Sequence, residues 1–265
     1  MSDAGAFSIA TWNVNSLRVR GEQLLQWLRD TQPDVVALQE TKIQDPDFPH
    51  PEFTAAGYHS VFSGQKTYNG VALLSKHPMT GFIRDIPDFD DAPRRVLAAT
   101  IPHPRGDFRV INLYVPNGQA PGSEKFAYKL RWLEALTRWL RAEAAAHPNL
   151  VVLGDFNVAP EDRDVHDPAA WLGCVHVSPE ERAALRGILD LGLVDAFRQF
   201  EQPEKSFSWW DYRQGGFRRN HGLRIDLILA HEQLRPRLKS VRIDVEPRRA
   251  ERASDHTPVI AYFDN

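Results

Sequence analysis

Cysteine is almost absent from this sequence, because Cys174 is the one thiol among 265 residues. A lone cysteine cannot form a disulfide within the chain, which argues against a secreted protein held together by disulfides and for a reducing compartment. The sequence also lacks an apolar run of the ~20 residues that a membrane helix needs, and residues 1–6 lack the basic-then-apolar order of a secretion signal. We therefore expect a cytoplasmic protein with no membrane segment.

Linkers, low-complexity tracts and short repeats are missing as well. Hydrophobic residues make up 42% of the chain and charged residues 25%, proportions that suit a globular protein with a sizeable core. We expect residues 1–265 to form a single domain that is a monomer, with residues 1–6 as a flexible tail.

A strong excess of positive charge is also lacking, since the formal net charge is −3. That value alone argues against a nucleic-acid-binding protein. The charge is unevenly placed, however, because residues 213–252 hold 11 Lys or Arg and five Asp or Glu. Such asymmetry suits a protein that places a basic face on a polyanion and keeps its acids for a metal ion, although a solvated arginine-rich surface is the simpler alternative.

Two hydrophobic patterns alternate along the sequence. Apolar residues at three- and four-residue spacing predict helices at 17–30 and 123–146, and Ser178 with Glu181 fits a capping box that starts another helix. Short apolar runs predict strands, and the mixture predicts an α/β fold of two packed sheets flanked by helices. The predicted strands are 7–13, 34–39, 58–62, 70–75, 95–101, 108–115, 150–153, 207–209, 223–229, 238–245 and 257–263.

Polar side chains repeatedly occur where an apolar strand begins or ends. A carboxylate beside a buried strand is costly unless it is paired or binds a cation, and strand ends gather at one rim of a sheet. Carboxylate and amide oxygens without a cysteine cluster favour Mg²⁺ or Mn²⁺ over zinc. The side chains concerned are Asn13, Glu40, Tyr114, Asp155, Asn157, Asp255 and His256.

Taken singly, several of these positions have simpler explanations. Asn117 with the glycine that follows it is typical of a hairpin turn. Glu40 and Lys42 could form a surface charge pair, and Asp155 could cap a turn.

Asp226 is harder to explain, because it lies within the apolar run 223–229. An unpaired carboxylate there would cost several kcal/mol, on the order given for buried charges. A histidine is the natural partner, and His256 at the start of the last strand is our candidate. A capping Asp255 beside a surface histidine is the alternative.

In this order, the segments resemble the exonuclease III family of abasic-site endonucleases, within the wider endonuclease/exonuclease/phosphatase superfamily. The resemblance implies a four-layered α/β sandwich of two packed mixed β-sheets flanked by helices, with the site at one end of the sheets. It also implies a phosphodiesterase that depends on magnesium, with Mn²⁺ as a substitute, and cuts double-stranded DNA 5′ to abasic sites. Such an enzyme would be cytoplasmic and act at the nucleoid. Activity on 3′ ends, as a 3′-5′ exonuclease and 3′-phosphatase, is implied as well. The matching segments are 10–15, 38–42, 114–118, 154–157, 209–212, 223–227 and 254–258.

The same resemblance implies a role for each matching residue. Asp155 orients or deprotonates the attacking water, and Asn157 supports it. Tyr114 contacts the phosphate or the leaving oxygen, while His256 contacts the phosphate and pairs with Asp226. The implied metal ligands are Glu40 above all, with Asn13, Asp155, Asn157, Asp255 and His256 nearby.

A small apolar pocket for a deoxyribose without its base is implied at Trp209, Leu223 and Ile225, although these are also ordinary core residues. Flipping out an abasic sugar sacrifices little pairing or stacking, which would select the lesion. Arginines nearby are expected to contact the DNA backbone without reading sequence. They are Arg95, Arg213, Arg218, Arg219 and Arg224.

Two other functions stay open at this point. The superfamily includes phosphatases that act on lipids and nucleotides, which the aromatic segment around Trp209 and the basic stretch disfavour. A DNA-binding protein without catalysis is the other alternative. It is disfavoured because every matched acid, amide, phenol and imidazole position holds a competent side chain.

Overall fold

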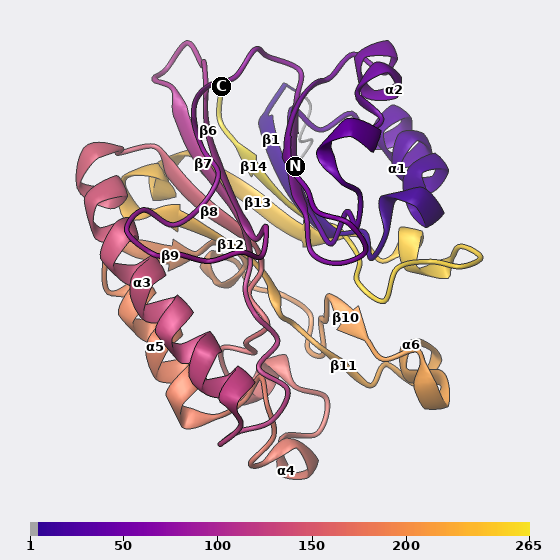
Figure 1. The fold of residues 1–265 in the computed structure, drawn as a ribbon, viewed down its shortest axis with the longest axis vertical. Coiled ribbons are helices and arrows are strands. Elements are labelled where there is room, and N and C mark those ends of the chain that lie inside the picture. The colour runs from indigo at the N-terminus through magenta and orange to yellow at the C-terminus, as the bar shows by residue number, and fades with distance from the viewer. Residues whose placement is uncertain (1–4) are drawn as a thin grey trace.

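The computed structural model describes residues 5–265, in which the strands form two six-stranded sheets and one two-stranded sheet (Figure 1). The first sheet contains β1 (Phe7–Asn13), β2 (Val35–Gln39), β3 (His59–Ser63), β4 (Val71–Ser75), β13 (Leu238–Ile243) and β14 (Val259–Phe263). The second contains β5 (Thr80–Ile83), β6 (Val96–Ile101), β7 (Phe108–Tyr114), β8 (Leu150–Asp155), β9 (Leu193–Asp195) and β12 (Asp226–His231), and the small sheet contains β10 (Trp209–Trp210) and β11 (Gly222–Leu223).

Both large sheets are mixed. The order of the first is β13-β14-β1-β2-β4-β3, and that of the second is β5-β6-β7-β8-β12-β9. Each has one parallel pair, β1 with β2 and β7 with β8, while its other neighbours run antiparallel. The predicted sandwich of two mixed sheets is therefore confirmed.

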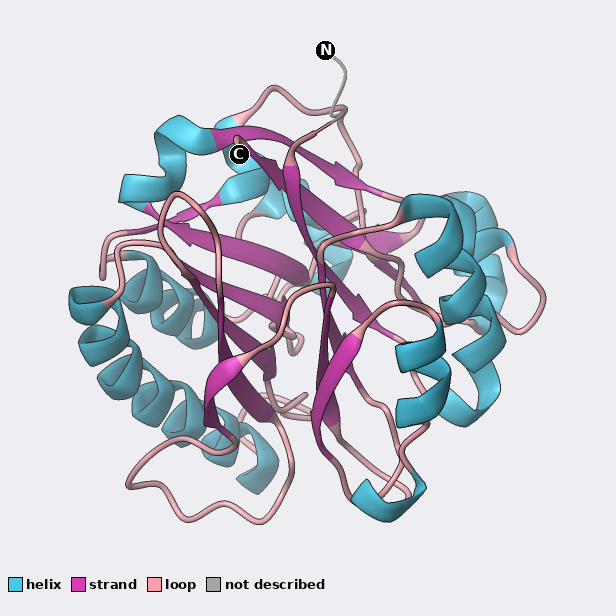
Figure 2. Ribbon diagram, turned by 90° about the horizontal axis from the view of Figure 1, so that it is seen from above, coloured by secondary structure: helices cyan, strands magenta, loops and turns pink. Residues whose placement is uncertain are grey.

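Helices cover the outer faces of the sheets, and the inner faces pack on each other (Figure 2). The core between the sheets joins residues such as Ile9 and Val35 with Val110 and Leu153. One outer face carries α1 and α2, and the other carries α3 and α5. The helices are α1 (Leu17–Thr31), α2 (His50–Ala55), α3 (Glu124–Ala146), α4 (Pro168–Trp171), α5 (Pro179–Leu189) and α6 (Gly216–Arg219).

The long helices begin where the sequence predicts. Ser123 caps α3 by accepting a hydrogen bond from the Phe126 amide. Ser178 and Glu181 form the predicted capping box at the start of α5. None of the helices in the described part of the chain is long and apolar enough to span a membrane. Of the predicted tail, residues 1–4 lie outside the described part, and the Gly5 carbonyl accepts a hydrogen bond from Asn265.

The prediction of one continuous strand at 223–229 is wrong. β11 ends at Leu223 and β12 begins at Asp226. Between them, the Ser208 hydroxyl oxygen accepts hydrogen bonds from the backbone amides of Ile225 and Asp226, each at 3.1 Å. A side chain thus replaces the sheet ladder at this point. Sequence patterns also missed the short elements α2, α4, α6, β5 and β9. Of these, β5 is mostly exposed and so lacks a buried apolar run.

A buried amide joins the two sheets near one end. Asn112 of β7 donates to the carbonyls of Leu38 and Ala72 in the opposite sheet, at 2.9 and 2.8 Å. Its own oxygen accepts from Gln39 at 2.8 Å, and Gln39 also donates to Thr11. Because buried amides and carbonyls are costly when unpaired, this network fixes how the sheets are placed relative to each other.

Replacing Asn112 with Leu should lower the free energy of unfolding by about 2–5 kcal/mol, since each buried group left without a partner costs ~1–3 kcal/mol. Urea denaturation followed by circular dichroism measures the loss. Ile111→Val on the same strand is the control, with an expected cost of ~0.5–1.5 kcal/mol. Equal costs for the two variants would contradict a role for Asn112 beyond packing.

Candidate active site at one end of the sandwich

Four strands deliver polar side chains to the same end of the sandwich. Asn13 is the last residue of β1, and Glu40 directly follows β2. These two strands run parallel to each other. Tyr114 and Asp155 are the last residues of β7 and β8, also parallel, and lie opposite each other in the register. Parallel strands end at the same edge of a sheet, so the predicted convergence follows from the topology.

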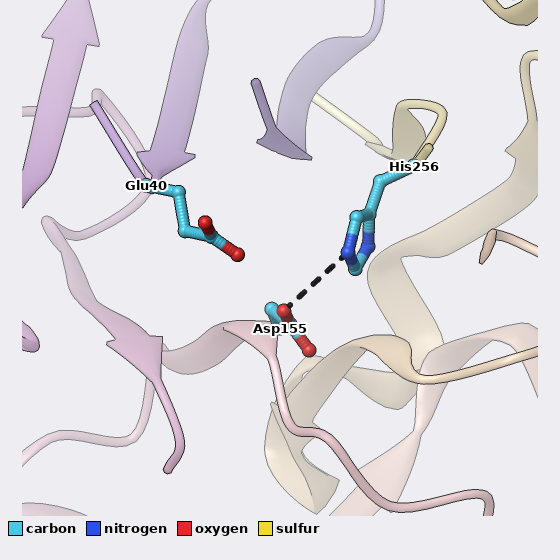
Figure 3. Close-up of side chains that lie close together, drawn as sticks. All are labelled: Glu40, Asp155 and His256. Carbon is cyan, nitrogen blue, oxygen red and sulfur yellow. Dashed lines mark ion pairs between the residues drawn. The ribbon is translucent and has the colours of Figure 1, made fainter. Parts of the chain in front are cut away.

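Two carboxylates and one imidazole form the centre of this site. Ligand atoms of Glu40, Asp155 and His256 lie within 4.8 Å of one another (Figure 3). The Asn13 amide nitrogen donates to both carboxylates, at 2.9 Å in each case. Asp155 and His256 are buried, whereas Glu40 is half-buried.

His256 is held by Asp226, as predicted from the cost of burying that carboxylate. Its Nδ1 lies 2.9 and 3.1 Å from the two Asp226 oxygens, and the Ser208 hydroxyl donates to Asp226 at 2.7 Å. Its Nε2 lies 3.7 Å from Asp155. This arrangement resembles an orienting carboxylate behind a histidine that faces the reacting group.

The pKa values of His256 and Asp155 are both raised, the first by neighbouring charges and the second by burial. Burial opposes the charge on His256, but Asp226 and Asp155 outweigh it and raise the imidazole pKa to about 10. Burial is also the largest effect on Asp155 and raises its pKa to about 7, against the attraction of His256. His256 is therefore an imidazolium at neutral pH, and Asp155 lies close to its titration midpoint.

Tyr114 stays protonated. Burial, followed by the charges of Glu40 and Asp155, raises the pKa of its hydroxyl well above the ordinary value. The Arg95 guanidinium lies 4.6 Å from the centre of the Tyr114 ring and donates to the Tyr114 carbonyl at 3.2 Å. The phenol is thus available as a hydrogen-bond donor, and Arg95 fixes its ring.

Asp255 lies at the edge of the cluster and outside the three-residue group. One of its oxygens accepts from the Asn15 amide at 2.9 Å and the other from the Trp209 indole at 3.0 Å. Lys42 donates to the Asn15 oxygen at 2.5 Å and lies 3.0 Å from Glu40. Asp255 is therefore joined to Glu40 through the Asn15 and Lys42 side chains.

Several backbone conformations at the site are strained. Asn15, Glu40, Lys42 and Asn157 all have positive φ angles, between 44° and 54°. Such conformations cost non-glycine residues about 1–3 kcal/mol each and persist where the surroundings fix them. Hydrogen bonds from the neighbouring loops supply that constraint, for example from the Asn157 amide to Asp155 at 2.9 Å.

The predicted sugar pocket is part of a small apolar cluster beside the carboxylates. Leu223 and Ile225 are buried in it, and Trp209 and Trp171 are only partly buried. The two indole rings meet edge to face, with centroids 6.4 Å apart. The structure thus brings the three predicted pocket residues together, with Trp209 offering the largest accessible wall.

The prediction that Arg224 contacts DNA is wrong, because its side chain is buried. It forms ion pairs of 2.7 Å with Asp164 and with Asp195. Arg224 and Arg198 outweigh burial and hold the pKa of Asp164 below its ordinary value. Arg224 thus anchors the segment between β11 and β12, next to Leu223 and Ile225.

The other predicted arginines near the pocket are exposed. Arg213 pairs with Asp211 at 2.6 Å, and Arg218 and Arg219 lie on α6. Figure 1 shows α6 beyond β10 and β11 at the site end of the sheets.

Four site residues are new relative to the sequence prediction: Asn117, Lys129, His176 and Glu181. Lys129 is fully buried on α3 and donates to the carbonyls of Asn117 and Asn157, at 3.1 and 2.7 Å. It also pairs with Glu181, which is equally buried. Lys129 lies four residues before Leu133 on the apolar stripe of its helix, and this spacing was the signal that it is buried.

His176 packs against the same loop. Its Nδ1 lies 2.6 Å from the Asn157 carbonyl, and the Asn117 amide is 3.4 Å from its Nε2. Burial and then Lys129 lower the pKa of His176 to about 4, so its ring is neutral. His176 and Lys129 together hold the backbone that presents Asn157.

A two-sheet α/β sandwich that gathers carboxylates, an amide and an imidazolium at one end belongs to the class of hydrolases that act on anionic esters. The chain is a member of the Endonuclease/Exonuclease/phosphatase family, whose sequence profile matches residues 10–256.

Named relatives cover nearly the whole chain. Exodeoxyribonuclease III of Haemophilus influenzae is 38% identical over 96% of this chain and 98% of its own length. The 3′ phosphatase NExo from Neisseria, solved with a product DNA hairpin, superposes with a TM-score of 0.95 at 46% identity, covering 98% of this chain and all of that one. An AP endonuclease from Archaeoglobus fulgidus gives a TM-score of 0.92 at 39% identity, with the same coverage.

Lys129→Met should lower the free energy of unfolding by about 3–5 kcal/mol, because it leaves the Glu181 charge buried without a partner. Lys129→Met combined with Glu181→Gln should recover most of the loss, since Gln can keep the capping box. Chemical denaturation measures both. The double variant should still show faster hydrogen exchange at amides 156–158 than the native chain. Native exchange rates there would contradict a positioning role for Lys129.

The raised pKa of His256 predicts a pH-dependent contribution to stability. Because the folded pKa exceeds the ordinary value of about 6.5, the contribution is complete below that pH and is lost as the pH rises towards 10. In Asp226→Asn the midpoint should fall towards the ordinary value. NMR titration of the imidazole in metal-free protein measures it, and Asp34→Asn, at the start of β2, should leave it unchanged. An equal midpoint in native and Asp226→Asn protein would refute this origin of the shift.

Proposed function

We propose that the protein is a magnesium-dependent repair phosphodiesterase that hydrolyses the DNA backbone 5′ to abasic sites, with 3′-5′ exonuclease and 3′-phosphatase activity. The observation that carries the proposal is the convergence of Glu40, Asp155 and an Asp226-bound His256 at one end of the sandwich. Relatives of nearly the same length are named for exodeoxyribonuclease, 3′ phosphatase and AP endonuclease activities.

Glu40 and Asp155 would hold the metal ion. Their carboxylates are neighbours in a largely buried site. A cation there would offset the repulsion between them and the cost of keeping the buried Asp155 carboxylate charged, a cost that raises its pKa in the absence of an ion. Oxygen donors suit Mg²⁺, with Mn²⁺ as a substitute. Asn13, Asn157 and Asp255 would complete the set of metal-site residues, whereas His256, as an imidazolium, would lie beside the ion without coordinating it. The bound ion would neutralise charge on the phosphate and on the leaving oxygen.

The side chains then divide the chemistry. His256, charged at neutral pH, would bind a phosphate oxygen and stabilise the charge that builds on it. Asp155 would orient the water and accept its proton, while the Asn157 amide holds the water in line. Tyr114 would donate its hydroxyl proton in a hydrogen bond to the phosphate or the leaving oxygen.

Several groups are needed because no single one supplies enough stabilisation. Enzymes lower barriers by ~8–23 kcal/mol, whereas removing one donor to a developing oxyanion typically costs about 3–4 kcal/mol. An imidazolium, a phenol, an amide and a bound cation acting together reach that range. A serine nucleophile is not required.

Substrate selection would depend on the pocket beside the carboxylates. Trp209, Leu223 and Ile225 would accept a sugar that lacks its base and exclude a complete nucleotide. Arg213 would bind DNA phosphates at the surface. Arg95 would act on the phosphate indirectly, by holding the Tyr114 ring in place. Double-stranded DNA with abasic sites or 3′ ends is the proposed partner, bound by a single-domain monomer near the nucleoid in the cytoplasm.

A labelled duplex with one reduced abasic site tests the proposal. Native protein with magnesium should cut on the 5′ side of the lesion and should stop when a chelator is added. Asp155→Asn and His256→Asn should each lower kcat at least 100-fold, in line with the loss of one preorganised group. Uncut duplex in the native lane with magnesium present would overturn the assignment.

Matched controls separate catalysis from folding. Asp30→Asn and His147→Asn make the same chemical changes at surface positions of α1 and at the end of α3, and both should retain native kcat. A duplex carrying a 3′-phosphate, compared with one carrying a 3′-hydroxyl, measures the two 3′-end activities in the same assay.

A further inference from the structure

A basic groove lies on the flank of the site, between α1 and the segment that follows the 3₁₀ helix η6 (Glu246–Arg249). Its volume is about 500 Å³. Three arginines and a tyrosine form its polar lining, namely Arg20, Arg248, Arg252 and Tyr212. Its remaining walls are small apolar side chains, so the guanidinium groups set its chemistry.

The three arginines of the groove differ from Arg213 and Arg224 in how their charge is compensated. Arg213 and Arg224 form ion pairs with aspartates. Within residues 5–265, none of Arg20, Arg248 and Arg252 forms an ion pair with a carboxylate. Their positive charge is therefore not neutralised inside the protein and extends into the groove.

Each arginine is placed by its surroundings. Arg20 donates to the carbonyls of Arg252 and Ala253, at 2.8 and 3.2 Å, and to the Tyr212 hydroxyl at 3.1 Å. Arg248 lies over the Tyr212 ring, 5.3 Å from its centre, and its Nε has no hydrogen-bond partner among the described atoms. Arg252 has an exposed side chain on a backbone with φ of 54°. Arg20 and Arg248 are thus held beside the groove by their contacts, and the exposed Arg252 side chain lies at its edge.

Hydrogen bonds connect the groove to the carboxylate cluster. The Asn15 amide lies 3.4 Å from the Tyr212 hydroxyl, and the Asn15 oxygen accepts from Lys42, which is 3.0 Å from Glu40. Two side chains therefore separate Tyr212 from the proposed metal ligand. Phosphates follow one another at about 3.4 Å of helix rise along one strand. A strand bound at the cluster would therefore bring a phosphate to the groove within a few nucleotides of the scissile bond.

We propose that this groove binds a backbone phosphate of the DNA duplex a few nucleotides from the scissile bond, with Arg252 and Arg248 as its ligands. This inference rests on the proposed function and extends the substrate site beyond the pocket. The contact reads no sequence, because it is made to the phosphate alone. Tight binding therefore requires a duplex long enough to carry this phosphate, and the contact adds to the salt dependence of binding.

Arg252→Gln tests the proposal with little risk to the fold, because that side chain is exposed and glutamine already has a positive φ at positions 32, 119 and 214. Binding of a fluorescent duplex with a reduced abasic site is measured in chelator at several salt concentrations. Losing one phosphate contact should reduce the slope of log K against log salt by about 0.9, which is roughly an eightfold weaker affinity at 0.1 M salt. Arg252→Glu should weaken binding further.

The control is Arg138→Gln, which removes an exposed arginine that pairs with Glu134 on α3. It should bind DNA like the native chain. Trimming the duplex from each end in turn should reach a length at which native and Arg252→Gln proteins bind equally, because the distal phosphate is then missing. Equal affinity and equal slope on the long duplex would overturn the proposal, as would an equal loss in Arg138→Gln.

The binding measurement needs no turnover, so it is independent of whether the native chain incises DNA. Incision by native protein together with native-like binding by Arg252→Gln would reject the groove alone. Weaker binding of inorganic phosphate by Arg252→Gln with unchanged affinity for DNA would reject the duplex as the occupant.

Discussion

The ion pair between His256 and Asp226 is the interaction on which the site depends. Without the imidazolium, Asp155 and Asp226 would be two buried carboxylates with a third, Glu40, close by. Such a cluster is strongly unfavourable unless a positive charge lies among the acids. His256 supplies that charge within the chain, 2.9 Å from Asp226 and 3.7 Å from Asp155.

Placing that histidine requires elements that are distant in sequence. Trp209 forms a β-bridge with His256, and the Thr257 amide donates to the Ser208 carbonyl. Ser208 also donates to Asp226, and so the short segment of Ser208 and Trp209 contacts both members of the ion pair. The Trp209 ring faces the apolar pocket from the same segment. Pocket shape and histidine orientation are therefore set by one small element.

Much of the site could be predicted from the sequence because its signals are local. Glu40 and Asp155 directly follow apolar strands, and parallel strands must end at one edge. The pairing of Asp226 with His256 followed from the cost of an unpaired buried carboxylate. These inferences needed only the residue and its immediate neighbours.

Other features depend on what covers a surface, which no local pattern contains. Arg224 alternates with Leu223 and Ile225, so its side chain leaves the pocket, but it enters a buried ion pair with Asp164 and Asp195 instead of solvent. The break between β11 and β12 likewise depends on the hydroxyl of Ser208, which directly precedes β10. The burial of Lys129 could be predicted from its place on the apolar stripe of α3, but its partner Glu181 comes from α5 and is not part of that pattern.

The net charge of −3 says little about DNA binding, because a total does not show which charged side chains are paired and which are free to act at the surface. Arg213 and Arg224 add to the count of cations, but each is neutralised by an aspartate and contributes little field at the surface. Arg248 and Arg252 have no such partner in the part of the chain that the structure describes, and they line the groove on the flank of the site. Because screening limits charge effects to about 10 Å at 0.1 M salt, a polyanion responds to the unpaired cations that it touches and not to the total. A weakly acidic chain can therefore present a basic surface to DNA while its acids remain at the centre for a metal ion.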